Sequence, residues 1–325
     1  MILVCGSIRD AVTELVCARL EAMRCPYRLL ELGWFPERYV IRCTWDGSHP
    51  NGEIEGPDWR LALSEISGVF VRFSPPEPDA GAALPTGRLR EAALIEHHAG
   101  LMALWENLSC PVANRVGGSL SNHSKPYQLL VIRRTRLRIP RTLVTSSPAD
   151  ARAFHDECGG RVIFKSLSGV RSVVRLMGTG DLDRLDVLRD CPAQFQEFVP
   201  GTNVRVHTVD GEVFATRIVS AAVDYRFAER EGAAAILEPT TVPAWVADAC
   251  LDLARGMGLV IAGIDLKVTP EGEWYCFEVN PCPAFAYYER RTGQPISAGL
   301  VAALRDGDNR TEKSAREAPQ EIATE

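Results

Sequence analysis

The sequence lacks the features of membrane-spanning and secreted proteins. None of its apolar runs approaches the roughly 18 residues that a membrane span requires. The apolar residues 1–6 have no basic region before them and are followed by Arg9 and Asp10, which predicts a buried first strand rather than a signal peptide. We therefore expect a cytoplasmic protein without a membrane partner.

Clustered cysteines and an excess of basic charge are missing as well. The 10 cysteines are scattered without any Cys-x-x-Cys pair, which argues against a compact zinc site and favours reduced thiols in the core. The 36 Lys and Arg residues are outnumbered by 42 Asp and Glu residues, for a net charge of −6. An acidic balance argues against nucleic acid as a partner.

Two common nucleotide-binding loops are also absent. Residues 5–7 do not continue into Gly-x-Gly-x-x-Gly, and no segment matches Gly-x-x-x-x-Gly-Lys-[Ser/Thr]. Any nucleotide site in this chain must therefore be built from other residues.

The first part of the chain has the apolar pattern of an open α/β sheet. We expect strands at 2–5, 27–32, 39–43 and 69–73 and helices at 12–23 and 88–107. The stretches 46–58 and 74–87 are rich in Gly, Pro and Asp and are expected to be loops.

From residue 141 onward the pattern changes to longer, paired strands. Asp210-Gly211 between two apolar runs predicts a two-residue hairpin turn, and a second hairpin is expected at 261–279. We expect an amino-terminal α/β domain at 1–115, a second domain at 116–305 and a disordered tail at 306–325.

The second hairpin carries oxygen ligands at strand spacing. Glu278 and Asn280 are two residues apart and therefore face one side of their strand. Asp265 lies nearly opposite, although a shift of one residue in register would turn it to the other face. Three hard oxygen donors suit Mg²⁺ completed by water and nucleotide phosphate oxygens. Taken alone, the pattern also fits a solvated hairpin.

Two lysines are candidates for binding phosphate. Lys165 ends an apolar strand just before the loop 166–172, in which Ser168 and Gly169 permit close approach of the backbone to a ligand. Lys125 stands in a helix expected at 120–135. Their ammonium groups are suited to a triphosphate, although each lysine alone also fits an ordinary surface position.

An apolar strand that runs into Pro200-Gly201 is a third candidate. Its backbone groups at 197–199 are available to the edge of an adenine ring. Arg205, and Arg217 on the next strand, are candidates to clamp a γ-phosphate or an acyl phosphate. Each arginine alone also fits a surface charge.

In their order along the chain these segments resemble the ATP-grasp superfamily over residues 111–304. The likeness is closest to ligases similar to the ribosomal-protein glutamate ligases and to the peptide maturases of the microviridin (graspetide) type. It rests further on Asn114 and on residues 124–129 (SKPYQL), 139–145 (IPRTLVT), 203–215 (NVRVHTVDGEVFA), 223–226 (VDYR) and 289–296 (ERRTGQPI).

The resemblance implies an ATP-grasp fold, in which an amino-terminal α/β domain is followed by two α+β lobes that clamp ATP. It also implies roles: Lys125 and Lys165 on the phosphates, Glu197, Phe198 and Val199 on adenine, Asn203 on ribose, Asp265, Glu278 and Asn280 on two Mg²⁺ ions, and Arg72 and Arg226 near the substrate. Asn203 departs from the acidic residue that many relatives carry there.

The function implied is an ATP-dependent ligase that joins a carboxylate to an amine or a hydroxyl through an acyl phosphate. We expect a ribosomally made, acidic peptide as the substrate and a homodimer as the assembly. A small-molecule ligase similar to glutathione synthetase, acting on amino acids, is the first alternative. A nucleotide-binding module without catalysis is the second.

Overall fold

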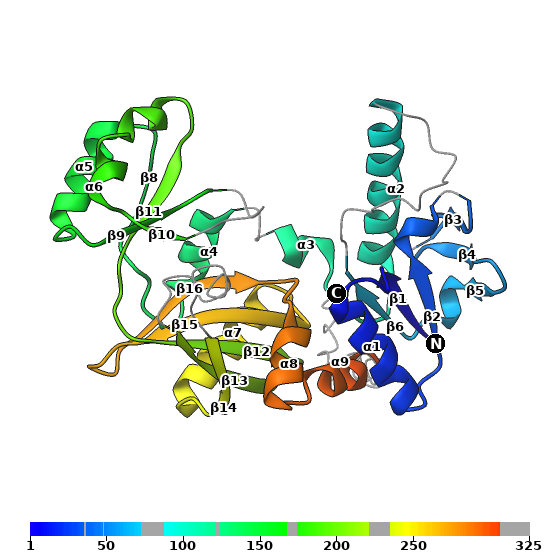
Figure 1. Ribbon diagram of the computed structural model, residues 1–325. Coiled ribbons are helices and arrows are strands. Elements are labelled where there is room, and N and C mark those ends of the chain that lie inside the picture. Colours follow the sequence, from blue (N-terminus) through cyan, green and yellow to red (C-terminus); the bar gives the residue numbers. More distant parts are fainter. Residues whose placement is uncertain are drawn as a thin grey trace, which may run out of the picture. The chain divides into compact units, whose positions relative to one another are not determined.

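The computed structural model describes residues 1–35, 37–47, 49–72, 88–120, 124–167, 174–220 and 235–305, which fall into two compact units (Figure 1). The first unit comprises Met1–Gly117, Gly258–Ile261 and Pro295–Glu325, and the second comprises Gly118–Met257 and Ala262–Gln294. We predicted a first domain that ends at residue 115. In the structure, residues 258–261 and the chain from residue 295 onward also belong to the first unit. The tail expected at 306–325 and the loop expected at 74–87 lie outside the described residues.

The first unit is built on a parallel sheet with the order β2-β1-β6-β7. Its strands are β1 (Ile2–Gly6), β2 (Tyr27–Glu31), β6 (Gly68–Val71) and β7 (Val112–Ala113). The helices of the unit are α1 (Ala11–Ala22), α2 (Arg88–Asn107) and α9 (Ile296–Arg305), with short 3₁₀ turns at Leu32–Trp34 and Leu63–Glu65, and the boundary to the second unit falls within α3 (Val116–Ser119). The open α/β sheet predicted from the sequence is confirmed.

Continuous apolar strands explain why this sheet is buried. All five residues of β1 are buried, and Leu3, Val69 and Trp105 belong to one core cluster. The helix α9 packs against α1 and β6. It comes so close that a Cβ on Gly68 would overlap the carbonyl oxygen of Leu304, so position 68 needs glycine.

A small antiparallel sheet also belongs to the first unit, with β3 (Val40–Thr44), β4 (Asn51–Glu55) and β5 (Arg60–Ala62). The loop expected at 46–58 is therefore wrong over Asn51–Glu55. The strand is polar, and its carboxylates pair with arginines on both neighbours: Arg42 contacts Glu55, and Arg60 contacts Glu55 at 3.1 Å. Cross-strand charge pairs of this kind take the place of an apolar pattern.

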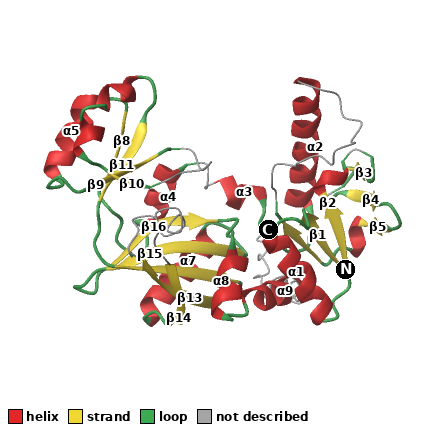
Figure 2. Cartoon of the chain, viewed as in Figure 1, coloured by secondary structure: helices red, strands yellow, loops and turns green. Residues whose placement is uncertain are grey.

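The second unit contains an antiparallel sheet with the order β10-β9-β11-β8. It consists of β8 (Thr142–Thr145), β9 (Val162–Lys165), β10 (Arg175–Leu176) and β11 (Ala193–Glu197), and α5 (Pro148–Glu157) and α6 (Thr179–Leu182) lie beside it (Figure 2). Phe154 of α5 and Phe195 of β11 belong to its core. A 3₁₀ turn follows over Leu185–Arg189.

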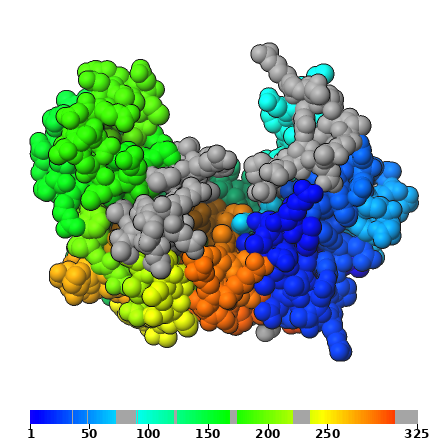
Figure 3. All heavy atoms as spheres, viewed as in Figure 1, coloured from blue at the N-terminus to red at the C-terminus, as the bar shows by residue number. Residues whose placement is uncertain are grey.

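A five-stranded sheet with the order β14-β13-β12-β15-β16 completes the second unit. Its strands are β12 (Thr202–Val209), β13 (Glu212–Ser220), β14 (Ala235–Thr240), β15 (Ile261–Val268) and β16 (Trp274–Asn280), and its helices are α4 (Lys125–Ile132), α7 (Ala244–Gly256) and α8 (Phe285–Thr292). Asp210 and Gly211 both have positive φ, 45° and 97°, which confirms the predicted two-residue turn. In Figure 3 the colours of this sheet run from yellow-green at β12 to orange at β16.

Two other expectations can be compared with the structure. The helix expected at 120–135 is shorter, because the Ser124 side chain accepts a hydrogen bond from the N–H of Tyr127 and starts the helix at Lys125. All 10 cysteines are free thiols. No helix in the described part of the chain is long and apolar enough to cross a membrane.

Candidate active site

A cavity of about 110 Å³ lies in the second unit between β9 and β11 on one side and β12, β13, β15 and β16 on the other. Because side chains alternate along a strand, Lys165 and Gln196 face the cavity while Phe164 and Phe195 face the opposite core. The cavity is lined by the predicted residues Lys165, Phe198, Val199, Asn203, Asp265 and Glu278.

Two buried lysines meet beside this cavity. Lys125 is 4% exposed and Lys165 is 6% exposed. Nζ of Lys125 donates a hydrogen bond of 3.0 Å to the carbonyl of Ser166, the residue next to Lys165. Buried ammonium groups beside a cavity are suited to binding an anion such as a phosphate by point charge. Ser168 and Gly169 lie outside the described residues.

The proposed metal ligands lie on one face of the β15–β16 hairpin. Asp265 pairs directly with Glu278, and Gly263 pairs with Asn280 two residues further on, so the register that the sequence left open turns Asp265 toward Glu278. The described residues hold no group of three His, Cys, Asp or Glu suited to a metal ion. Two carboxylates and one amide oxygen fit Mg²⁺, which takes few protein ligands and keeps water or phosphate oxygens.

Arg205 is a buried charge held against one of these carboxylates, that of Asp265. Its Nη1 lies 2.8 Å from Oδ1 of Asp265, and the Arg205 side chain is only 5% exposed. The guanidinium lies so close to Gly263 that a Cβ there would overlap its Nη2 atom. A planar cation fixed beside a candidate metal ligand can orient a phosphoryl group and balance its charge.

Arg217 does not join this group. It lies opposite Val204 in the β12–β13 register, whereas Arg205 lies opposite Thr216, so the two arginines point to different faces of the sheet. Arg217 is half exposed and pairs with Glu238 of β14. We therefore leave Arg217 out of the catalytic set.

The other end of the cavity is suited to a flat, apolar ring. Phe198, Val199 and Phe277 line it together with Lys267, whose Nζ donates a hydrogen bond of 3.0 Å to the carbonyl of Val199. Burial lowers the pKa of Lys267. The Glu197 side chain instead accepts a hydrogen bond from the N–H of Arg141 at 2.9 Å, and Glu197 does not line the cavity.

Sequence reasoning missed two polar residues of this cavity, as well as apolar ones such as Phe277. Lys267 lies two residues beyond Asp265 in the same strand, a spacing that the alternation rule already connects to the site. Gln196 is fully buried; its Nε2 donates to Oγ1 of Thr142 at 2.9 Å, and its Oε1 has no partner among the described residues. A lone glutamine carries no motif, so only the structure identifies it.

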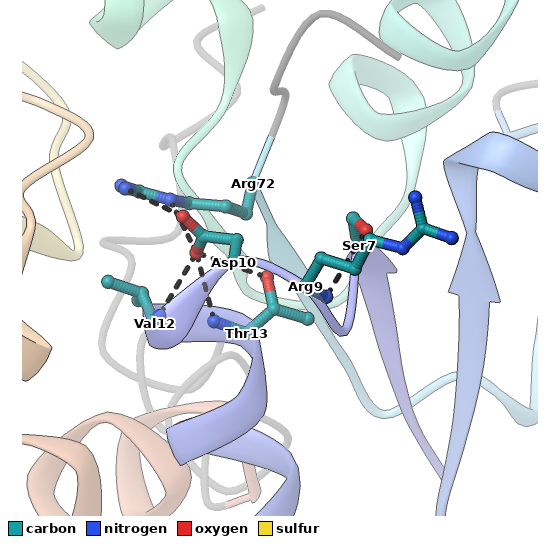
Figure 4. A network of polar contacts seen from close by, with 6 residues as sticks. All are labelled: Ser7, Arg9, Asp10, Val12, Thr13 and Arg72. Atoms are coloured by element: carbon teal, nitrogen blue, oxygen red, sulfur yellow. Dashed lines mark hydrogen bonds and ion pairs between the residues drawn. The ribbon is translucent and has the colours of Figure 1, made fainter. Parts of the chain in front are cut away.

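Of the residues assigned to the substrate, Arg72 lies in the first unit, where it pairs with Asp10 (Figure 4). Its Nε lies 3.1 Å from Oδ1 of Asp10, and that oxygen also accepts hydrogen bonds from the N–H groups of Val12 and Thr13 at the start of α1. Arg72 follows β6 and Asp10 follows β1, so the pair lies at the carboxyl ends of these two parallel strands. Open α/β sheets bind ligands at this end. Arg226 lies outside the described residues.

The family model described as the RimK-like ATP-grasp domain matches residues 121–304. The chain belongs to this family. The matched range contains every residue that lines the cavity, and also Lys125 and Arg205, and the fold of the chain is the ATP-grasp fold.

Curated relatives and solved structures agree with this membership. A probable alpha-L-glutamate ligase of Shewanella halifaxensis is 25% identical over 274 residues, covering 78% of this chain and 58% of the relative. A second, from Shewanella pealeana, is 24% identical, with 80% of this chain and 54% of the relative covered. This chain therefore spans little more than half the length of these curated relatives.

Among solved structures, macrocyclase MdnC from Microcystis aeruginosa, bound with precursor peptide MdnA, is 26% identical with a TM-score of 0.79, over 94% of this chain and 99% of that one. The ATP-grasp ligase PsnB in complex with a minimal precursor is 28% identical with a TM-score of 0.78, over 94% and 98%. PsnB is also known with a minimal precursor, Mg and ADP, at 29% identity, a TM-score of 0.76 and coverage of 93% and 96%.

Proposed function

We propose that this protein is an ATP-dependent ligase that activates a carboxylate as an acyl phosphate and joins it to an amine or a hydroxyl. The observation that carries the proposal is the cavity lined by the buried Lys165 and by the carboxylates of Asp265 and Glu278, with the buried Arg205 paired to Asp265. Membership of the RimK-like ATP-grasp family supports it.

Each residue has a task in this reaction. ATP supplies the phosphoryl group, and Mg²⁺, as two ions held by Asp265, Glu278 and Asn280, would neutralise its negative charge. Lys125 and Lys165 hold the phosphates in place by point charge. Phe198, Val199 and Phe277 enclose the base, and Asn203 reaches the ribose. Arg205 balances charge that develops when the carboxylate attacks.

We further propose a peptide as the substrate. MdnC and PsnB, which cover nearly the whole of this chain, were solved with precursor peptides. Arg72 of the first unit is suited to bidentate binding of a carboxylate, and with Arg226 it supports an acidic peptide. A free amino acid remains the alternative, because curated relatives are probable glutamate ligases. A homodimer in a reducing cytoplasm completes the proposal.

The test is to incubate the protein with Mg²⁺-ATP and a panel of acidic peptides and free amino acids, and to follow intact mass and ADP. Loss of about 18 Da per bond, one water, supports the peptide substrate, and a mass gain of one residue supports an amino-acid ligase. ADP release without either product would contradict ligation. Light scattering reports the assembly state.

A matched pair of variants tests the site within the same assay. Arg205→Met should lower turnover by at least about tenfold, since hydrogen bonds to charged groups contribute roughly 1.5–3 kcal/mol. Arg217→Met should leave turnover within about twofold, because Arg217 and its partner Glu238 lie on the face of the sheet opposite to Arg205. Equal loss in both variants would contradict the assignment.

A further inference from the structure

His207 of β12 is a buried polar residue that the proposed reaction does not use. It lies two residues beyond Arg205 on the same face of the strand and is 0% exposed. Its Nε2 accepts a hydrogen bond of 3.5 Å from Nε of Arg205. An imidazole nitrogen that accepts cannot carry a proton, so the proton of the neutral ring resides on Nδ1.

The surroundings keep this imidazole neutral. Burial, and next the positive charge of Arg205, hold the pKa of His207 well below its usual range. A protonated ring would lose the acceptor and repel the guanidinium. His207 therefore remains an acceptor for Arg205 throughout the neutral pH range.

Nδ1 of His207 is buried and has no hydrogen-bond partner among the described residues. A buried donor without a partner is costly, and an aliphatic side chain of similar size would avoid that cost. We therefore expect the imidazole to make a polar contact here that an apolar side chain could not make. The contact that an aliphatic side chain would lose is the one with Arg205.

Four contacts fix the guanidinium of Arg205 from different directions. Nε donates to His207, Nη1 pairs with Asp265, and Nη2 lies against Gly263. The ring of Tyr288 packs against both partners: its centroid is 5.6 Å from Cζ of Arg205 and 4.8 Å from the centroid of the His207 ring. The His207 contact is made by the Nε edge of the guanidinium.

We propose that His207 is a positioning residue for Arg205, which holds the plane of the guanidinium at the angle needed to meet the transferring phosphoryl group. The inference rests on the proposed function. Orientation of a charged group before the reaction strongly affects rate, because the charge then needs no rearrangement in the transition state. A fault in orientation should therefore reduce kcat and leave the KM for ATP nearly unchanged.

Two amide variants and one apolar variant test this role. In His207→Gln the amide oxygen reaches the position of Nε2, whereas the shorter side chain of His207→Asn reaches only the position of Nδ1; His207→Leu has no acceptor. We expect His207→Gln to retain kcat within about twofold. His207→Asn and His207→Leu should lose at least about 10-fold, the lower end of the range for one hydrogen bond to a charged group. Equal activity of all three variants would overturn the proposal.

A second background separates positioning from simple support of the fold. Arg205→Lys keeps a positive charge but has no Nε–H, so adding His207→Leu to it should lower kcat no further. An independent loss of the same size in both backgrounds would show that His207 acts without Arg205. Melting temperatures of the same variants show whether any loss of kcat follows from unfolding.

A readout without ATP keeps this inference apart from the proposed function. In protein labelled with ¹⁵N-arginine, the Nε–H resonance that disappears in Arg205→Lys identifies Arg205. Its exchange with water should be slow in the wild type and in His207→Gln, and fast in His207→Leu. If no ligation is found, the proposed function fails, yet this measurement still decides whether His207 holds Arg205.

Discussion

At the residue scale, two arginines on neighbouring strands have opposite surroundings. A two-residue turn at Asp210-Gly211 pairs Val209 with Glu212, and from there Arg205 falls opposite Thr216 while Arg217 falls one place away, on the other face. Because the sequence predicts the turn, it also predicts that Arg205 and Arg217 lie on opposite faces of the sheet. The burial of Arg205 was not predictable, because it depends on Asp265 from a strand 60 residues further along the chain.

Glycine at position 263 is the second requirement of Arg205. A Cβ there would overlap both Nη2 of Arg205 and Cβ of Pro283, so Gly263→Ala should push the guanidinium away from Asp265. We expect ATP-dependent turnover to fall at least about tenfold, since the displaced group loses a charge-assisted contact. Steady-state kinetics measures the loss.

The matched control is Gly256→Ala in α7, where a Cβ meets no atom within 4 Å. That variant should keep full turnover and gain roughly 0.5–1 kcal/mol of stability, because glycine inside a helix is unfavourable relative to alanine. Full turnover of Gly263→Ala would show that the exact place of the guanidinium is unimportant.

At the scale of elements, one buried glutamine ties α4 to the edge strand β16. Nε2 of Gln128 donates to the carbonyl of Val279 at 2.7 Å, and Oε1 accepts from the N–H of Val279 at 3.1 Å. The amide therefore satisfies both backbone groups of a residue between Glu278 and Asn280. This contact therefore fixes the helix that carries Lys125 against the strand that carries Glu278 and Asn280, two of the proposed metal ligands.

Gln128→Met should therefore destabilise the second unit. It leaves two buried backbone groups without partners, each worth about 1–3 kcal/mol, so we expect the free energy of unfolding to fall by about 2 kcal/mol or more in urea denaturation. Leu130 of the same helix is 61% exposed, and Leu130→Gln should stay within about 0.5 kcal/mol of the wild type. Similar values for both variants would deny Gln128 this role.

Whether the sequence predicts an element depends on how that element is stabilised. Strands and helices with an apolar period, such as β1, α1 and the β12–β13 hairpin, are found at the expected places. The polar strand β4 is missed, because its stability comes from Arg42 and Arg60 outside its own segment. The return of α9 to the first unit is missed because contacts far apart in sequence leave no local pattern.

At the scale of the whole molecule, free thiols are present in the cores of both units. Cys5, Cys17 and Cys110 are buried in the first unit, and Cys250 and Cys276 in the second. Burial raises the pKa of Cys5 and of Cys250 to about 12 and that of Cys17 to about 11, and places that of Cys276 well above its usual value. Since the thiolate is the reactive form, these thiols should be inert in the native state.

Alkylation therefore tests the packing of both units in one experiment. Brief treatment with iodoacetamide at pH 8 should modify the exposed Cys191 and Cys282 first, and peptide mapping by mass spectrometry identifies the modified sites. The five buried thiols should react only after addition of a denaturant, which also provides the control that every site can be detected. A thiol can react only where the reagent and water reach it. Early modification of Cys5 would therefore mean that the core of the first unit opens readily. Early modification of Cys276 would mean the same for the sheet that carries Asp265 and Glu278.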